Sequence, residues 1–221
     1  MAGFTPANIW GGITAVRESM YIPTATVIEK GEPVIFTPGT GVAVVATPGT
    51  LNEAIRGVAA QAHVANSGTS IEVFCDPNII FKTKPTDVIT ATGGSTTTFV
   101  DSNLPNVNNL FTDGYIEVVT CAAGIPVKTL IKITGYTGST GTITFAAQTA
   151  AFASGDTVYL YPGKRCVGYS TFSLTADAMN IDWESASTTG KALHIYDCDP
   201  EAKLVLVKFL EYRHAAQVAT M

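Results

Sequence analysis

Between residues 93 and 161 the chain reads GGSTTTFVDSNL (93–104), DGYIEVVT (113–120), TLIKITGYTGSTGTITF (129–145) and ASGDTVYLY (153–161). In these runs β-branched and aromatic residues alternate with polar ones, a pattern typical of half-buried β-strands. Glycine or aspartate bounds each run. Glycines at 135, 138 and 141 allow the positive φ that hairpin loops need. The stretch therefore predicts a compact all-β module with a hairpin between Ile133 and Phe145.

The segments on both sides of this module also read as strands. Short β runs separated by turn signals fill residues 25–49 and 70–83, and strong runs return at 192–212. For residues 50–63 two interpretations stand side by side. One is a turn and a short helix, capped by Thr50 or Asn52, that leads into a strand. The other is an extended strand bent at a glycine.

Neither flank alone has enough strands to close a sheet, and polar stretches bound the module on both sides. Because closure removes exposed strand edges, we expect one all-β body interrupted by a second small β domain. The body is a small β-barrel or sandwich, with at most one or two short helices in the chain. The expected parts are an N-terminal arm (1–20), a discontinuous body (21–85 plus 164–214), the inserted module (86–163) and a tail (215–221).

Composition argues against several classes of function. Of the 221 residues 46% are hydrophobic and 14% are charged, which is ample for a packed core. The net charge is −5 and the 13 lysines and arginines are dispersed, so the footprint of a nucleic-acid binder is missing. No run has the roughly twenty apolar residues that span a bilayer, and the N-terminus does not read as a signal peptide. We expect no direct contact with nucleic acid or membrane.

The four cysteines, at positions 75, 121, 166 and 198, lie far apart and match no metal-ligand spacing. A chain of this size does not need disulfides to hold its fold. We interpret them as buried thiols of a protein made in a reducing cytoplasm.

The titratable residues form no recognisable catalytic frame. The chain has three histidines, which are His63, His194 and His214. Acidic residues follow His194 closely, so a triad with Cys198 or Ser170 as nucleophile is conceivable. No GxSxG nucleophile elbow accompanies it, and a structural or surface histidine is the stronger interpretation. We predict that the protein is not an enzyme and has no cofactor.

Three acidic residues, Asp197, Asp199 and Glu201, have the alternate spacing of oxygen ligands in a calcium loop. The loop lacks the glycine and the later bidentate glutamate of that motif, and Pro200 favours an ordinary tight turn. We therefore predict no metal site.

Two places are candidates for contact with a partner. The first twenty residues have no sustained period and read as an arm that becomes ordered on a partner. The candidate contact residues of this arm are Phe4, Ile9, Trp10, Ile13 and Val16. The second place is Trp183, in the loop-like MNIDWESASTTG (179–190). A large aromatic side chain there is either a plug over one end of the barrel or an interface anchor.

The module resembles a small β module of tailed-bacteriophage structural proteins, on the residues DGYIEVVTCAAG (113–124), IKITGYTGSTGTITF (131–145) and FASGDTVYLY (152–161). The flanks resemble the β-rich body of phage capsid decoration, or cement, proteins, on VIEKGEPVIF (27–36), RGVAAQA (56–62) and SIEVFCDPN (70–78). WESASTTGKALHIYDCDPEAKLVLVKF (183–209) is similar to the C-terminal part of such proteins. The family has no catalytic residues to carry over.

The resemblance implies a virion structural protein that binds the outer surface of the phage capsid, commonly as a homotrimer, and stabilises junctions between capsomers. Its partner would be the major capsid protein. It would be synthesised in the host cytoplasm and located on the capsid exterior. The alternative is a phage tail, baseplate or fibre component with a carbohydrate-binding or adhesin role. In that case exposed aromatic residues would stack on sugar rings, and the candidates are Tyr136, Tyr159, Tyr161 and Trp183.

Overall fold

The computed structural model describes residues 4–9, 17–37, 42–45, 55–75, 79–85, 88–163, 171–174, 181–187 and 193–209. Within these residues the chain is all-β, with strands β1 to β18 in three antiparallel sheets and no α-helix. The all-β prediction is confirmed. The described strands form no closed barrel, and the arrangement is that of packed, sandwich-like sheets.

The six-stranded sheet combines strands from both ends of the chain, in the order β1-β7-β18-β17-β15-β16. Its strands are β1 (Thr5–Ile9), β7 (Ile79–Thr83), β18 (Leu204–Phe209), β17 (Leu193–Asp199), β15 (Thr171–Leu174) and β16 (Ile181–Ser187). β7 lies between β1 and β18, so the first and last described strands are joined through it. In β18 the side chains of Val205, Val207 and Phe209 are buried, as their alternation predicts.

The five-stranded sheet is made by the N-terminal flank alone, in the order β2-β6-β5-β3-β4. Its strands are β2 (Arg17–Tyr21), β6 (Ser70–Phe74), β5 (Ile55–Ala59), β3 (Pro33–Thr37) and β4 (Val42–Val45). Residues 55–59 are therefore extended, while the short helix considered before them falls outside the described residues. This sheet has a separate small hydrophobic core, which consists of Met20, Ile22, Ile28, Val34, Ala59, Ile71 and Val73.

The module, residues 88–163, holds the seven-stranded sheet in the order β8-β14-β11-β12-β13-β10-β9. Its strands are β8 (Ile89–Thr90), β14 (Thr157–Tyr161), β11 (Tyr115–Thr120), β12 (Leu130–Thr137), β13 (Thr142–Phe145), β10 (Thr98–Val100) and β9 (Gly93–Gly94). β8 and β9 lie in one short segment, residues 89–94, which pairs with β14 through its first half and with β10 through its second. Ala91 and Thr92 continue this pairing through their N–H groups, which donate to Asp156 and Val100 carbonyls respectively. The sheet therefore curls around its core.

The predicted hairpin is the β12–β13 pair, closed by a 3-10 turn, η2 (Gly138–Thr140). Of its three glycines only Gly141 has positive φ, at 61°. Gly138 is needed for space, because a Cβ atom there would lie 2.3 Å from the backbone nitrogen of Val107. Gly135 lies inside β12 at an irregularity in the pairing. The hairpin is confirmed, and its glycines serve different purposes.

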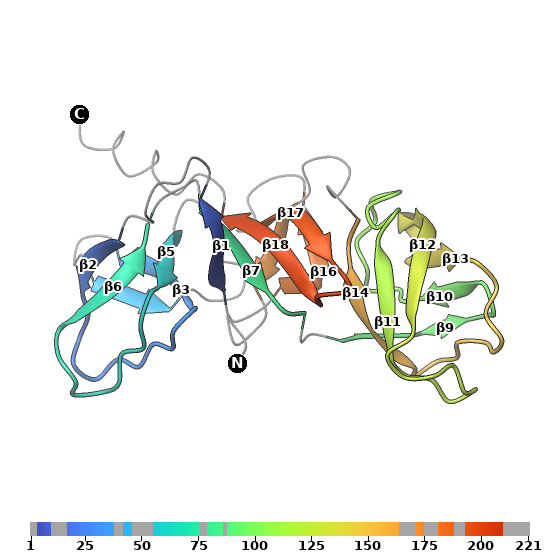
Figure 1. Cartoon of the computed structure of the whole chain (residues 1–221), viewed down its shortest axis with the longest axis horizontal. Helices are drawn as coiled ribbons and strands as arrows, with labels where there is room; N and C mark the ends of the chain where they lie inside the picture. The colour runs from blue at the N-terminus through green and yellow to red at the C-terminus, as the bar shows by residue number, and fades with distance from the viewer. Residues whose placement is uncertain are drawn as a thin grey trace.

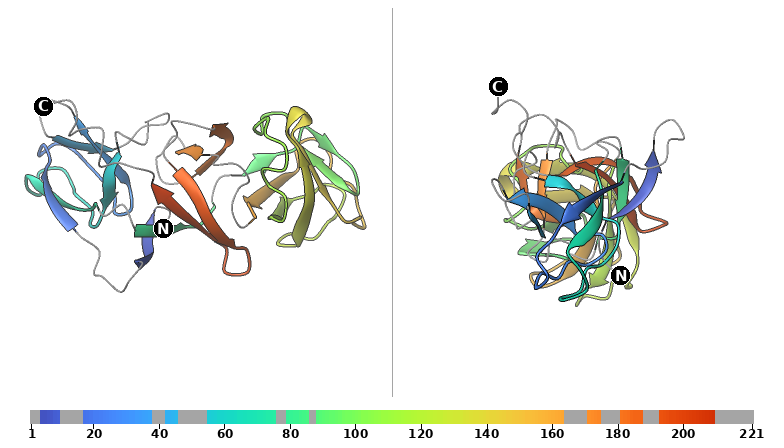
Figure 2. Two further views of the ribbon diagram at one scale, coloured as in Figure 1. Left: turned by 90° about the horizontal axis from the view of Figure 1, so that it is seen from above. Right: turned by 90° about the vertical axis from the view of Figure 1, so that its left-hand side faces the viewer.

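The three sheets lie in a row, with the six-stranded sheet between the other two (Figure 1), and the view from above keeps this order (Figure 2). One buried apolar cluster runs through all three, since it includes Val58 of the five-stranded sheet, Phe81 and Trp183 of the six-stranded sheet and Ile116 of the module. Continuous burial of this kind is the largest favourable contribution to folding.

The described residues of the predicted N-terminal arm, 4–9 and 17–20, do not form a free arm. β1 pairs with β7, and β2 pairs with β6 over its whole length. Strands of five residues that complete two sheets are part of the fold, because their backbone groups already have partners. Because the first twenty residues have no sustained hydrophobic period, the sequence did not predict strands β1 and β2.

Candidate functional site

The predicted contact residues of the N-terminus do not gather on a described surface. Phe4 is buried, its ring meets that of Phe209 edge-on at 5.1 Å between centroids, and its N–H donates to the Gly31 carbonyl. This corrects the prediction for Phe4, which belongs to the core. Ile9 lies in β1, and its side chain is outside the described part. The other predicted contacts, Trp10, Ile13 and Val16, fall outside the described residues.

Trp183 lies in strand β16 and not in a loop, and its side chain is fully buried. Its ring meets that of Phe111 in the module at 6.5 Å between centroids and 88° between planes. Trp183 therefore neither plugs a barrel nor stands exposed as an anchor, but packs where the six-stranded sheet meets the module. The signal that was missed is the alternation of buried Ile181 and Trp183 with more exposed Asp182 and Glu184.

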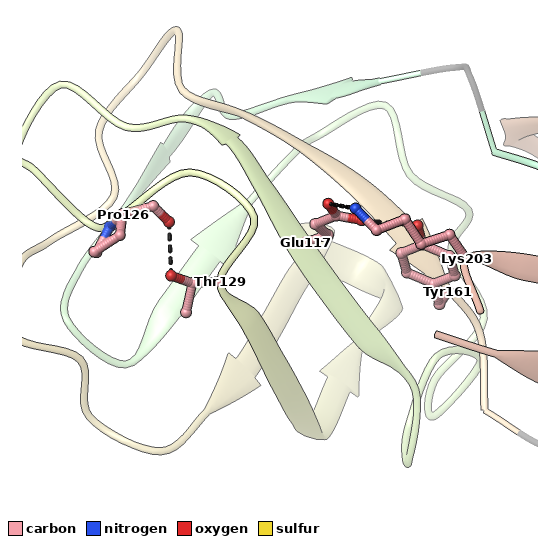
Figure 3. A network of polar contacts seen from close by, with 5 residues as sticks. All are labelled: Glu117, Pro126, Thr129, Tyr161 and Lys203. Atoms are coloured by element: carbon pink, nitrogen blue, oxygen red, sulfur yellow. Dashed lines mark hydrogen bonds and ion pairs between the residues drawn. The ribbon is translucent and has the colours of Figure 1, made fainter. Parts of the chain in front are cut away.

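A partly buried polar cluster joins the module to the six-stranded sheet (Figure 3). Glu117 of β11 is buried and accepts two hydrogen bonds, from the Tyr161 hydroxyl at 2.9 Å and from the Lys203 ammonium at 2.5 Å. Lys203 lies in the turn between β17 and β18 and has a left-handed φ of 56°. We call Glu117, Tyr161 and Lys203 the clamp, because it joins two module residues to the neighbouring sheet.

In the clamp, Tyr161 and Lys203 are the hydrogen-bond donors and Glu117 is the acceptor. Burial, and then the hydrogen bond to Glu117, raises the pKa of the Tyr161 hydroxyl well above its ordinary value, so this group stays a proton donor. The Lys203 side chain is 46% exposed, which leaves its ammonium partly hydrated while Glu117 is not. A buried carboxylate with two donors is satisfied and holds its neighbours in place. The clamp therefore acts by holding these residues in position.

A cleft of about 710 Å³ opens between the module and the β17–β18 hairpin. Its lining mixes polar and apolar surface and consists of Asp113, Tyr115, Lys132, Asp197, Cys198, Asp199, Pro200, Glu201 and Leu206. Within it a carboxylate oxygen of Asp199 accepts the N–H of Ala202 at 2.9 Å. A carboxylate oxygen of Asp197 accepts the N–H of Cys198. These bonds shape the turn, and among the described residues no group of acidic, cysteine or histidine side chains could hold a metal ion.

The described residues do not test the triad that the sequence made conceivable at His194. His194 lies in β17 with its side chain outside the described part, and Ser170 and His214 are also outside it. His63 is buried, and its two ring nitrogens lie 2.8 Å from the Thr26 carbonyl and 3.1 Å from the Gly68 carbonyl. It therefore ties the loop between β5 and β6 to the preceding chain, in agreement with a structural histidine.

The cysteines are only partly as predicted. Cys75 is buried, whereas Cys121 and Cys198 are partly exposed. Cys166 falls outside the described residues. Cys75 thus belongs to the core, and Cys121 and Cys198 are partly buried and pack against it.

The aromatic residues considered for sugar stacking are mostly inside the molecule. Tyr136, Tyr161 and Trp183 are buried, and Tyr136 donates its hydroxyl proton to the Pro105 carbonyl at 2.6 Å. Tyr159 is partly buried. A stacking platform needs an open ring face, which these three buried rings do not offer.

Exposed apolar side chains lie at loops and strand ends that sequence reasoning did not single out. Among the described residues, the large apolar side chains that are more than half exposed are Tyr21 (55%), Val27 (56%), Val64 (63%) and Val127 (60%).

No protein-family model matches the sequence, and comparisons with curated proteins and with solved structures found no match. Among the described residues no helix is long and apolar enough to cross a membrane.

Proposed function

We propose that this protein is a virion structural protein that binds the outer surface of a phage capsid and stabilises it at capsomer junctions. The motifs at residues 113–161 and in both flanks support the proposal through their resemblance to decoration proteins. The structural observation that carries it is the clamp at Glu117, which fastens the inserted module to the six-stranded sheet. Together with the buried apolar cluster that includes residues of all three sheets, the clamp supports one extended unit.

An extended unit of this kind suits a protein that bridges subunits. Binding across a junction stabilises the shell only when the bridging body resists bending, because a hinged body lets the two sides separate. Contact at many identical sites adds avidity, and homo-oligomers such as a trimer match the symmetry of a shell. Neither bridging a junction nor forming an oligomer requires a cofactor or a catalytic group.

The carbohydrate-binding alternative is less favoured, because three of its four aromatic candidates are buried. A tail, baseplate or fibre component with an adhesin role differs from the proposal in its partner as well as in its location.

Cosedimentation with mature capsids that lack this protein tests the proposal. We expect saturable binding at a fixed ratio to the major capsid protein, and a rise in the temperature at which the capsids break open. Capsids treated with heat-denatured protein serve as the control. Failure of the native protein to sediment with the capsids would contradict the proposal and direct the search to the tail.

A further inference from the structure

We infer that the cleft of about 710 Å³ between the module and the β17–β18 hairpin binds an arginine-bearing segment of a partner protein. This inference goes beyond the proposed function and does not depend on it. The features that carry it are the two walls of the cleft, their unequal balance of charge, and the clamp that joins them.

One wall of the cleft is the outer face of the β17–β18 hairpin. The pairing of the two strands skips Tyr196 as a β-bulge, which places Asp197 opposite Leu206. Asp197 and Asp199 are two residues apart on one strand, so their side chains lie on the same face as Leu206. Lys82 of β7 is opposite Leu206 on its other side and does not line the cleft. This wall therefore presents two carboxylates beside an apolar side chain.

The other wall belongs to the module and is balanced in charge. Tyr115 of β11 is directly opposite Lys132 of β12, so the two side chains share a face. The Lys132 ammonium lies 3.8 Å from a carboxylate oxygen of Asp113. The one lysine of the lining is thus already paired on its own wall, beside a partly exposed tyrosine.

The negative charge of the hairpin wall is not balanced by a described residue. Asp197, Asp199 and the exposed Glu201 form no ion pair within the part of the chain that the structure describes. Lys203, which follows Glu201 by two residues, bonds Glu117 of the clamp instead. Three carboxylates on one side of a cleft attract a cationic group and repel anionic partners such as nucleic acid or acidic lipid.

An arginine side chain matches both walls. Its planar guanidinium can donate to two carboxylates at once, and its flat face packs against an aromatic ring. Asp197 and Tyr115 supply these partners from opposite walls, while Leu206 and Pro200 offer apolar contact to the methylene groups of the side chain. No described group of side chains has the ligands for a metal ion. Because the cleft opens between two sheets, an extended chain can lie along it with its arginine inside.

The clamp holds the two walls together. Glu117 is two residues after Tyr115 on β11, and their side chains share one face of the strand. Lys203 lies in the hairpin turn next to the acidic wall, and its ammonium bonds Glu117 (Figure 3). A site whose walls are already joined loses little conformational entropy when its ligand binds.

The test measures binding of the fluorescently labelled peptide Gly-Ser-Arg-Gly-Arg-Ser-Gly to the full chain by fluorescence anisotropy. The ligand control has citrulline in place of both arginines, because citrulline keeps the shape of the side chain and removes its charge. Unlabelled arginine amide is the competitor that represents a small cation. Binding is compared at low and at high salt.

The variants are Asp197→Asn, Glu201→Gln and the double variant. Asparagine keeps an oxygen that can accept the Cys198 N–H, and Glu201 is exposed, so we expect all three variants to fold. Thermal unfolding checks this. Glu29→Gln is the matched control, since Glu29 is also exposed but does not line the cleft.

We expect saturable binding of the arginine peptide that high salt weakens, and binding of the citrulline peptide that is weaker by at least about tenfold. Each single variant should weaken binding about threefold and the double variant about tenfold, with Glu29→Gln unchanged.

Three results would overturn the inference: absence of binding, equal binding of the two peptides, or full binding by the folded double variant. Arginine amide that competes as strongly as the unlabelled peptide would overturn the choice of a protein segment. The experiment uses no capsids, so this inference and the proposed function can fail separately.

Discussion

Asp101 shows how one buried carboxyl group affects the module. Its side chain is fully buried, and one carboxyl oxygen accepts the N–H of Asn103 at 3.0 Å. Burial raises the pKa of this carboxyl above its ordinary value, although the backbone N–H groups of Asn103 and Thr90 oppose the shift. The folded protein therefore holds this proton more tightly than the unfolded chain.

The sign of the pH effect follows from that difference. A raised pKa in the folded state favours folding at low pH, and the advantage is lost as the pH rises through the folded-state pKa. We expect Asp101→Asn to increase the free energy of unfolding by about 1 kcal/mol at pH 7 and by less near pH 4. Urea unfolding of both proteins across this range measures the difference. A gain that is the same at every pH would show that ionisation of Asp101 is not its cause.

At the scale of secondary-structure elements, the β12–β13 hairpin depends on Gly141. Its φ is 61°, and a Cβ atom there would meet the Asp101 carbonyl oxygen of the neighbouring segment. We expect Gly141→Ala to lower the free energy of unfolding by at least about 2 kcal/mol, because backbone strain and a steric clash add. Gly155→Ala is the control, since Gly155 also has positive φ but has nothing within 4 Å of the added carbon.

Urea unfolding compares the two alanine variants. Gly155→Ala should lower the free energy of unfolding by about 1 kcal/mol, which is the cost of placing alanine in a left-handed backbone conformation. Equal losses in both variants would mean that the close approach at Gly141 relaxes without cost and that the hairpin does not depend on it.

Individual strands could be predicted from the sequence where alternation is strong, as in Val205, Val207 and Phe209 of β18. The pairing of β1 with β7 could not, because pairing between segments about seventy residues apart leaves no local pattern. Trp183 was misplaced because the polar residues around it suggested a loop, whereas they are the outward positions of a strand. The local sequence pattern thus predicted individual strands better than it predicted which strands pair with each other.

The candidate site was less predictable than the fold for the same reason. Glu117 and Lys203 are 86 residues apart, and only the folded chain brings them together. Which valines remain uncovered is likewise a property of the complete surface.

At the scale of the whole molecule, the clamp should contribute more to stability than an exposed ion pair. Lys203→Met would leave the buried Glu117 carboxylate with Tyr161 as its one remaining clamp donor, and we expect the free energy of unfolding to fall by about 2–3 kcal/mol. Lys132→Met is the matched control, because Lys132 and Asp113 form a 3.8 Å pair that is mostly exposed. That variant should change stability by less than about 1 kcal/mol.

Urea unfolding of the double variant Glu117→Gln, Lys203→Met completes the comparison. Removing the unpaired charge should restore part of the loss caused by Lys203→Met alone. If both lysine variants lose the same stability, the clamp does not hold the module in place.

The segment at residues 89–94 has a consequence for how copies of the protein behave together. Because its two halves cap both ends of the seven-stranded sheet, the backbone there is already occupied. A neighbouring molecule finds little open strand on the module onto which it could add its own, which is the usual route to fibrous aggregates. Crowded copies can thus stand close together without their modules merging into one continuous sheet.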